Sequence, residues 1–178
     1  MVAANFDKAF AFCLIDEKGN DDDPLDRGGR TSDGITQREY DAWCDLHKSP
    51  RGDVWLASMD TKKAIYYAQY WMPVCNNLPT GIDYLFFDTN VNSGYHEAAL
   101  ILQRCLNVAV DGHVGVITVA AALSWPDKRA LVDAFCAEHD RVYHLIVQAH
   151  PTDQRFMRGW ENRIAHEKAN AYAMLAPT

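Results

Sequence analysis

The chain has 178 residues, of which 48% are hydrophobic and 23% are charged. These proportions are ordinary for a globular protein with one well-buried core or at most two small domains. The net charge of −7 argues against a nucleic-acid binder, which needs a basic footprint to neutralise phosphates. No stretch approaches roughly 18 consecutive apolar residues, the length that spans a membrane, so we expect no membrane span and no nucleic-acid partner.

The first residues and the cysteines indicate a chain made without a signal peptide. Asp7 offsets the only early basic residue, Lys8, and acidic residues stand where a signal peptidase would need small ones. The cysteines are odd in number, widely spread and mostly set among apolar neighbours, so we expect buried free thiols rather than disulfides. They are Cys13, Cys44, Cys75, Cys105 and Cys136.

A first helix is predicted near the N-terminus, because apolar residues recur there every three or four positions and so share one face. These residues are Phe6, Ala9, Phe10, Cys13 and Leu14. Gly19 and Asn20 end the helix, and a polar loop rich in Asp and Gly follows up to Ser32. Strand signals are weak everywhere, and we expect at most a short hairpin around residues 22–36.

Several helices are predicted next. Thr36 and Glu39 form the pattern of a capping box, which predicts a helix over residues 37–47. A helix beginning near residue 60 should bury one face, made of Ala64, Tyr67, Ala68 and Trp71. The apolar run 81–91 predicts another helix. A further one, ending near Asn107, is predicted by the spacing of Ala98, Ile101, Leu102, Cys105 and Leu106.

The C-terminal part is also predicted to be helical. Residues 115–123 should form a short buried helix. Ser124 and Pro126 suit the N-cap and the first turn of a long helix that runs to about Gln148. Pro151 breaks that helix, and a last one should run over about residues 153–174. The chain should therefore be mainly α, a compact helical bundle with at most a short β-hairpin after the first helix.

Glu17 continues the apolar stripe of the first helix by one turn, after Phe6, Phe10 and Cys13. A carboxyl group held against apolar surface keeps its proton more readily, which is how an enzyme provides a general acid near neutral pH. Taken alone, a solvated glutamate at a helix end is the simpler interpretation of this residue.

The segment from Glu17 to Thr36 resembles the signature of glycoside hydrolase family 108, a family of phage and prophage N-acetylmuramidases. The signature reads E-G-G-x-x-x-D-P-x-D-x-G-G-x-T-x-x-G-I-T, and every specified position except Lys18 matches. The resemblance implies a lysozyme-like endolysin that hydrolyses the β-1,4 bond between N-acetylmuramic acid and N-acetylglucosamine. It implies that Glu17 is the general acid and that no cofactor and no metal are needed.

Elements of the same family recur nearly to the end of the chain. They are Tyr70-Trp71, Phe87–Gly94, Leu102-Gln103 with 111–118, and Gly159–Arg163. We expect a catalytic lysozyme-like region at residues 1–80 and a helical region at residues 81–178, packed as one body. The resemblance implies a peptidoglycan-binding segment in the second region. We expect a monomer whose partner is the peptidoglycan glycan strand. Like the phage enzymes it resembles, it would be made in the host bacterial cytoplasm and reach the wall through a holin-type pore.

Further residues would complete the catalytic site. Glycoside hydrolysis usually needs a second group that positions water or stabilises the oxocarbenium ion. Asp26 and Thr31 follow Glu17 across the loop, and the order Glu, Asp, Thr resembles the catalytic trio of phage-type lysozymes. Asp26 would orient or deprotonate water, assisted by Thr31. Alternatively, Asp26 caps a turn and Thr31 has a structural role.

The substrate would lie against Gly28 and Gly29, whose freedom of φ permits close approach of a sugar. The resemblance adds Tyr70 and Asn92 as substrate-binding residues. We interpret Phe87-Asp88 and residues 160–163 as core and ion-pair structure rather than as catalytic groups.

Two departures from the family pattern bear on the site. Lys18 replaces a glycine, and its ammonium would favour the ionised form of Glu17 if it turned inward. Asn20 replaces an aromatic residue that would contact either sugar or the core.

Rival functions include a lytic transglycosylase that uses Glu17 alone and a non-catalytic peptidoglycan-binding protein that uses residues 82–125. The intact series Glu17, Asp26, Thr31 disfavours both. A Ca²⁺ loop at residues 16–27, a zinc amidase and a Cys–His peptidase are disfavoured, because the sequence lacks their ligand spacings or an activating context for a cysteine.

Overall fold

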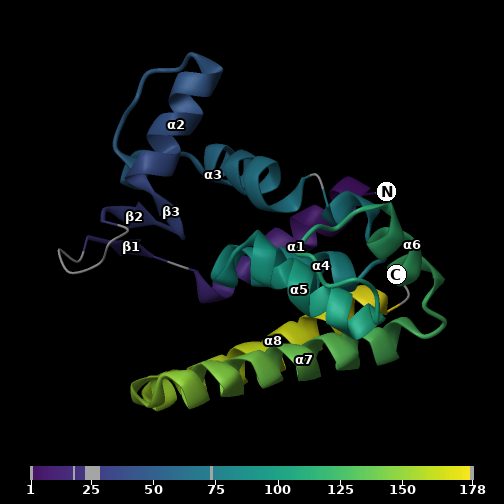
Figure 1. Ribbon diagram of the computed structural model, residues 1–178. Coiled ribbons are helices and arrows are strands. Elements are labelled where there is room, and N and C mark those ends of the chain that lie inside the picture. Colours follow the sequence, from purple (N-terminus) through teal and green to yellow (C-terminus); the bar gives the residue numbers. More distant parts are fainter. Residues whose placement is uncertain (1, 18, 23–28, 73, 177–178) are drawn as a thin grey trace. The chain divides into compact units, whose positions relative to one another are not determined.

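The computed structural model describes residues 2–17, 19–22, 29–72 and 74–176 (Figure 1). The chain divides into two compact units. The hairpin unit comprises residues 10–69, and the helical unit comprises residues 1–9 with 70–178. Helix α1 (Val2–Asp16) therefore contributes its first half to the helical unit and its second half to the hairpin unit.

The hairpin unit contains a small antiparallel sheet in the order β1-β2-β3. The strands are β1 (Asn20–Asp21), β2 (Thr31–Ser32) and β3 (Ile35–Thr36). Asp33 and Gly34 join β2 to β3 with φ angles of 47° and 78°. Two central residues at positive φ are typical of a type I′ turn, which an Asp-Gly pair favours. The expected short hairpin is therefore confirmed.

Helix α2 (Gln37–His47) begins and ends where the sequence predicts. Thr36 Oγ1 accepts a hydrogen bond from the backbone N–H of Glu39 over 3.2 Å, and the Glu39 carboxylate accepts one from the backbone N–H of Thr36 over 2.8 Å. The capping box thus provides an acceptor for two backbone N–H groups at the start of the helix, those of Thr36 and Glu39. Lys48 adopts the left-handed conformation and ends the helix.

Helix α3 (Met59–Tyr66) follows a 3-10 turn at Val54–Leu56 and continues into a π-helical segment at Tyr67–Trp71. Its predicted buried face is wrong except at Trp71. The buried positions are Lys62, Ile65, Tyr66 and Trp71, not Ala64, Tyr67 and Ala68. The prediction assumed an uninterrupted α-helix. Positions 66 and 71 are five residues apart, the spacing of a π-helical turn, which a 3.6-residue pattern cannot represent.

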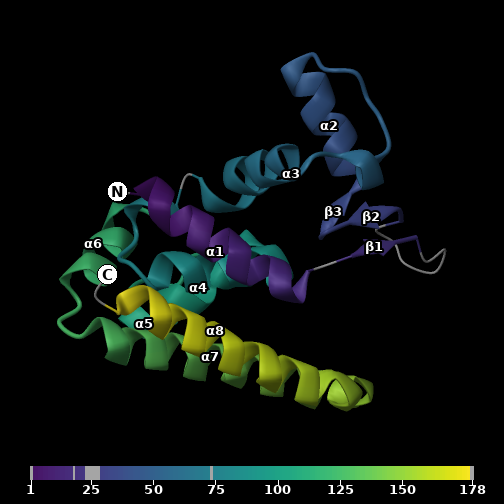
Figure 2. The ribbon, with the colours of Figure 1, turned by 180° about the vertical axis from the view of Figure 1, so that it is seen from behind.

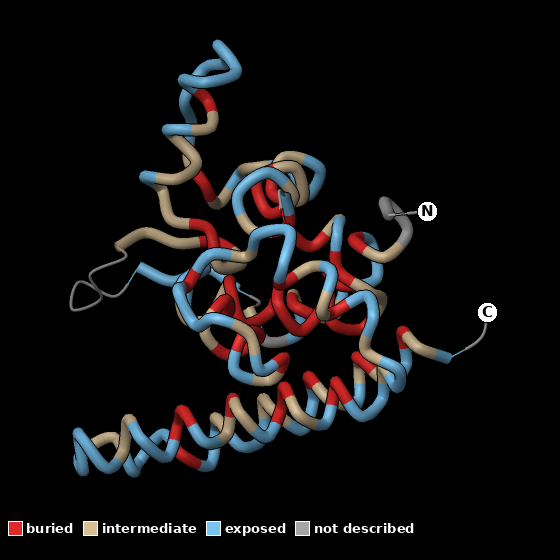
Figure 3. Tube along the Cα trace, turned by 45° about the vertical axis from the view of Figure 1, so that its right-hand side comes forward, coloured by how far each residue is buried: buried red, intermediate tan, exposed pale blue. Residues whose placement is uncertain are grey.

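The helical unit is built around α4 (Ile82–Ser93), whose residues 82–90 are all buried. It packs with α5 (Tyr95–Leu106), α7 (Lys128–Ala149) and α8 (Met157–Leu175). Helices α7 and α8 lie side by side in both views (Figures 1 and 2). The buried positions of α7 recur every three or four residues, which places one stripe of the helix in the core (Figure 3).

The first half of α1 joins this core through aromatic contacts. Phe6 packs edge-on against Trp71 and Phe87, with ring centroids 5.3 and 5.9 Å apart. Asn5 Nδ2 donates hydrogen bonds to Thr80 Oγ1 over 3.0 Å and to Asp83 Oδ2 over 2.8 Å. The N-terminal residues of the chain therefore depend on residues that come much later in the sequence.

Helix α6 (Val116–Ser124) corrects one prediction, because it is not a buried helix. Only Thr118 and Ala122 are buried, whereas Val116 is 85% exposed and Ile117 is 72% exposed. Apolar composition predicted burial, but burial also requires packing partners, and α6 packs chiefly on α5.

Two helix starts also differ from the prediction. The N-cap of α7 is Asp127 rather than Ser124, because its carboxylate accepts hydrogen bonds from the backbone N–H groups of Arg129 and Ala130. The last helix begins at Met157 rather than near residue 153, because Pro151–Phe156 form a 3-10 helix first.

The fold class is confirmed as mainly α with one small sheet. All five cysteines are free thiols, and all but Cys105 are buried. Among the described residues, no helix has both the length and the apolar character that a membrane span requires.

Candidate active site

Glu17 lies immediately after α1, and its backbone N–H donates to the carbonyl oxygen of Cys13 over 3.2 Å. The side chain is half-buried. Its carboxylate lies against the β2–β3 turn, since a Cβ atom built on Gly34 would be 3.3 Å from Glu17 Oε2. A half-buried carboxyl group can be shielded on one side and still reach a substrate on the other, as a general acid must.

Tyr66 reaches the same turn from α3. A Cβ atom on Gly34 would lie only 2.3 Å from Tyr66 Oη, so the close approach of the two requires glycine. The Tyr66 hydroxyl donates a hydrogen bond to the carbonyl oxygen of Asp33 over 2.9 Å. Its ring packs edge-on against Phe10 of α1, with centroids 5.2 Å apart. The oxygens of Tyr66 and Glu17 therefore converge on the space beside Gly34.

A buried ion pair fixes this turn. The Lys62 ammonium donates to Asp33 Oδ2 over 2.7 Å and to Ser32 Oγ over 2.6 Å, and Lys62 is 5% exposed. The backbone N–H of Gly19 donates to Asp33 Oδ1 over 3.1 Å, and that of Asp33 donates to the Gly19 carbonyl over 2.8 Å. Because Gly19 follows Glu17 by two residues, these bonds hold the turn beside the end of α1.

Thr31 lies in β2, where its hydroxyl donates to the carbonyl oxygen of Gly29 over 2.8 Å. The carbonyl of Thr31 accepts a hydrogen bond from Trp55 Nε1 over 3.0 Å. Gly29 has a φ of 62°, and nothing lies within 4 Å of the position that a Cβ would take. These bonds give Thr31 a structural role, and its catalytic role stays a prediction.

Other predicted positions are described in part. Asp26, Gly28 and Lys18 lie outside the described residues, so their roles stay predictions. Asn20, which replaces the family's aromatic residue, is exposed in β1, and its side-chain oxygen accepts a hydrogen bond from Ser32 Oγ over 2.6 Å. Asn20 therefore contacts the hairpin.

Acidic side chains around the hairpin are paired with cations. Arg30 donates to both carboxylate oxygens of Asp53, over 2.9 and 2.6 Å, and to Asp22 over 3.1 Å. Its hydrogen bonds hold the pKa of Asp53 below the usual range. Within the described part of the chain, no group of three or more His, Cys, Asp or Glu residues is placed to hold a metal ion.

Tyr70 and Asn92 both belong to the helical unit, but they are not brought together. The carbonyl oxygen of Tyr70 accepts a hydrogen bond from Asn90 Nδ2 over 2.9 Å. Asn92 instead donates to Tyr143 Oη over 3.0 Å. Asn90 and Asn92 are two residues apart on α4, and such residues point to different sides of a helix. The contact with Tyr70 and the contact with Tyr143 therefore lie on different sides of α4.

Two family elements meet in a buried charge cluster. Arg163 lies 3.1 Å from Asp88, and His139 Nδ1 lies 3.1 Å from Glu167 Oε2. Burial raises the pKa of Asp88 to about 7 and lowers the pKa of His139 to about 4. The interpretation of Asp88 and Arg163 as ion-pair structure is confirmed. Tyr143 stacks on Trp160 with ring centroids 4.6 Å apart.

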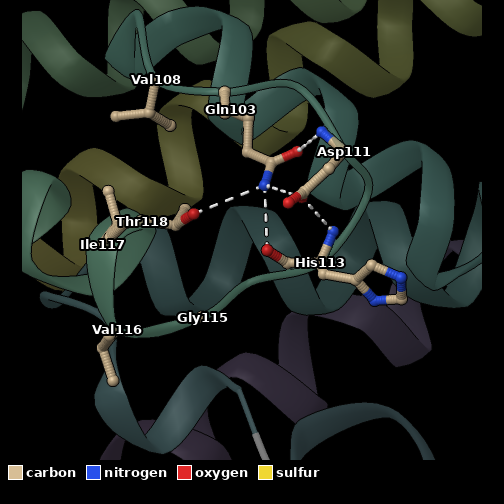
Figure 4. Close-up of a pocket in the computed structure, with 9 residues that line it drawn as sticks. Gln103, Val108, Asp111, His113, Gly115, Val116, Ile117 and Thr118 are labelled. Atoms are coloured by element: carbon tan, nitrogen blue, oxygen red, sulfur yellow. Dashed lines mark hydrogen bonds between the residues drawn. The ribbon is translucent and has the colours of Figure 1, made fainter.

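The buried side chain of Gln103 organises the loop that leads to α6 (Figure 4). Its Nε2 donates to Asp111 Oδ1 over 2.7 Å and to the carbonyl of His113 over 2.9 Å, and its Oε1 accepts from the backbone N–H of Gly112 over 2.9 Å. A pocket of about 180 Å³ lies beside this network. An apolar groove of about 540 Å³, which shares Gly115 and Val116 with the pocket, lies along α6.

Comparison with known families assigns both parts of the chain. Residues 10–94 match the family described as glycosyl hydrolase 108, and residues 97–165 match the family described as a predicted peptidoglycan domain. Just under half of the chain therefore resembles a glycosyl hydrolase 108 domain. The chain is a glycoside hydrolase that acts on peptidoglycan.

The chain is also similar to a solved structure, that of Brucella abortus SagA. The two share 27% sequence identity with a TM-score of 0.79, over 99% of this chain and 98% of that chain. No significant match was found among curated proteins.

Sequence reasoning missed Tyr66, Lys62 and the role of Gly34. The Asp33-Gly34 pair is a hairpin signal that would have placed the turn. Tyr66 and Lys62 carry no comparable local signal, because their contacts depend on how α3 packs against the hairpin.

Proposed function

We propose that the chain is a muramidase that hydrolyses the β-1,4 bond between N-acetylmuramic acid and N-acetylglucosamine, with Glu17 as the general acid. The observation that carries the proposal is the position of the Glu17 carboxyl group. It lies half-buried against the Gly34 turn, within the segment that matches the glycosyl hydrolase family. Glu17 would protonate the glycosidic oxygen as the bond breaks.

A hydrolase must also bring water to the anomeric carbon. We assign this task to Asp26, which would orient or deprotonate the water, with Thr31 as its hydrogen-bonding partner. Gly28 and Gly29 would let the sugar approach the backbone, and the open space over Gly29 supports that part of the proposal. Tyr70 and Asn92 are retained as candidates for substrate contact. Because Asp26 and Gly28 lie outside the described residues, mutation is the test of their roles.

Glu17→Gln tests the assignment of the acid. Glutamine keeps the size and the polarity of the side chain but cannot donate the acid's proton, so turnover on purified peptidoglycan should fall by roughly 10²- to 10⁴-fold. Zymography and release of soluble muropeptides would measure it. Asp7→Asn, an exposed carboxylate on α1, is a matched control that should keep wild-type activity. Lysis by a correctly folded Glu17→Gln protein would reject the proposal.

A lytic transglycosylase remains the rival enzymatic function. Such an enzyme needs one acid/base and lets the 6-hydroxyl of muramic acid attack in place of water. The hairpin unit favours hydrolysis, because the edge of its sheet is polar and open: Asn20 and Asp21 in β1 are both exposed. Asp26→Asn should therefore lower the rate severely, whereas an enzyme that uses Glu17 alone would tolerate it.

We further propose that the α6 groove and the adjoining pocket hold the wall polymer while Glu17 cleaves it. Both lie within or beside residues 97–165, the part that matches the predicted peptidoglycan domain. The setting in which this occurs, a phage-type endolysin that acts as a monomer after release through a pore, is part of the same proposal and comes from the sequence motif.

A further inference from the structure

The Tyr66 hydroxyl has a fixed direction. It donates its one hydrogen to the carbonyl oxygen of Asp33 over 2.9 Å, so its oxygen presents only lone pairs to other neighbours. The ring is fully buried and is held edge-on by Phe10 of α1. Phe10 and Glu17 belong to the same stretch of chain, so Tyr66 is held in register with the end of α1.

The Tyr66 oxygen and the Glu17 carboxylate both lie close to Gly34. A single point, the Cβ position of Gly34, lies 2.3 Å from Tyr66 Oη and 3.3 Å from Glu17 Oε2. Any side chain at this position would displace the Tyr66 hydroxyl and crowd the Glu17 carboxylate. The φ of 78° at Gly34 also disfavours other residues.

The charges that face this point balance one another. The Asp33 carboxylate is paired with the Lys62 ammonium over 2.7 Å, and it also accepts a hydrogen bond from the Gly19 N–H. A close ion pair presents little net charge to its surroundings. Among the described residues, the lone pairs of Tyr66 are therefore a feature of this face of the hairpin that can discriminate between a protonated and an ionised Glu17.

We propose that Tyr66 is a positioning residue for the general acid. Its oxygen accepts a hydrogen bond from the protonated carboxyl group of Glu17, which keeps the proton on the acid and orients it toward the substrate. An acceptor without a free hydrogen stabilises only the protonated form of a carboxyl group. The role rests on the proposed function, in which Glu17 is the acid.

The test is the pH profile of Tyr66→Phe. The variant keeps the ring and its contact with Phe10 but removes the acceptor, so Glu17 should lose its proton at lower pH. We expect the alkaline limb of the kcat profile to move down by about one pH unit, the effect of a single hydrogen bond on an acid's ionisation, with KM little changed. Tyr84→Phe is the matched control, because Tyr84 is equally buried and also loses one hydrogen bond, from Asn170, in the helical unit.

A structural role alone would lower the melting temperature of both tyrosine variants and leave both pH profiles as in the wild type. An alkaline limb of Tyr66→Phe that stays in place or moves to higher pH would overturn the proposal. If Tyr66→Phe does not fold, Gly34→Ala provides the same readout, since its methyl group displaces the Tyr66 hydroxyl. Activity retained by Glu17→Gln would instead reject the proposed function, whatever the profile of Tyr66→Phe.

Discussion

Gly34 illustrates how a residue without a reactive group can shape a candidate catalytic site. It permits the turn, it admits the Tyr66 hydroxyl, and it leaves space beside the Glu17 carboxylate. Glu17 itself could be predicted from the motif that surrounds it, because the motif is contiguous in sequence. Tyr66 could not, because its proximity to Glu17 arises only when α3 packs on the hairpin and on Phe10.

The buried charges of the helical unit make a prediction about its stability. Asp88 has a raised pKa, so its favourable contribution is present below about pH 4 and is lost as the pH rises toward about 7. His139 has a lowered pKa, so its contribution is present above about pH 6.5 and is lost as the pH falls toward about 4. In the wild type, the effects of Asp88 and His139 on the free energy of unfolding therefore oppose each other between about pH 4 and about pH 6.5.

Asp88→Asn should remove one of the two opposing dependences. The free energy of unfolding of the variant should then rise more steeply from pH 4.5 to pH 6.5 than that of the wild type, because the opposing dependence of Asp88 is absent. Urea titrations at several pH values would measure it. Parallel curves for the two proteins would show that the cluster does not titrate in this range.

Among the elements, helix ends that depend on neighbouring residues could be predicted from the sequence. Burial that depends on packing between elements could not. The capping box of Thr36 and Glu39 fixed the start of α2 because both partners lie within four residues. The prediction for the buried face of α3 was wrong because a π-helical turn follows the helix. The prediction for α6 was wrong because, among the described residues of the helical unit, it packs chiefly on α5 and leaves most of its apolar side chains exposed. The exposed apolar side chains of α6 are thus available to a ligand.

Val116→Asp tests whether the α6 groove binds the wall. Val116 is 85% exposed and lines both the groove and the pocket, so the substitution should cost little stability. Cosedimentation with purified sacculi should weaken at least several-fold, because a charge is placed in an apolar site. Leu145→Asp, at an exposed apolar position of α7 that lines neither, should bind as the wild type does. An equal loss of sacculus binding in both variants would argue against specific binding in the groove.

For the whole molecule, the main question is whether the region predicted as catalytic can stand alone. The sequence offers no linker, and the predicted boundary at residues 80 and 81 stays a prediction. The first half of α1 has partners late in the chain: Asn5 with Asp83, Phe6 with Phe87, and Lys8 with the carbonyl of Ala173. Such long-range contacts leave no sequence signal, which is why the division of α1 between two units could not be predicted.

A fragment of residues 1–80 should therefore not fold by itself. It would retain Phe6 and Trp71 but lack Phe87, the third ring of their cluster, and all of α4. Thermal melting followed by circular dichroism should show a broad change without cooperativity, in contrast to the full chain. A sharp melt of the fragment would mean that the catalytic region is an independent domain.

The central claim, hydrolysis with Glu17 as the acid, is tested most directly by the chemistry of the products. Purified peptidoglycan would be digested with the wild type and with Glu17→Gln, and the muropeptides would be analysed by mass spectrometry. We predict reducing N-acetylmuramic acid ends in the wild-type digest and almost no products from Glu17→Gln. Products with 1,6-anhydromuramic acid ends, or the same reducing ends from Glu17→Gln, would contradict the claim.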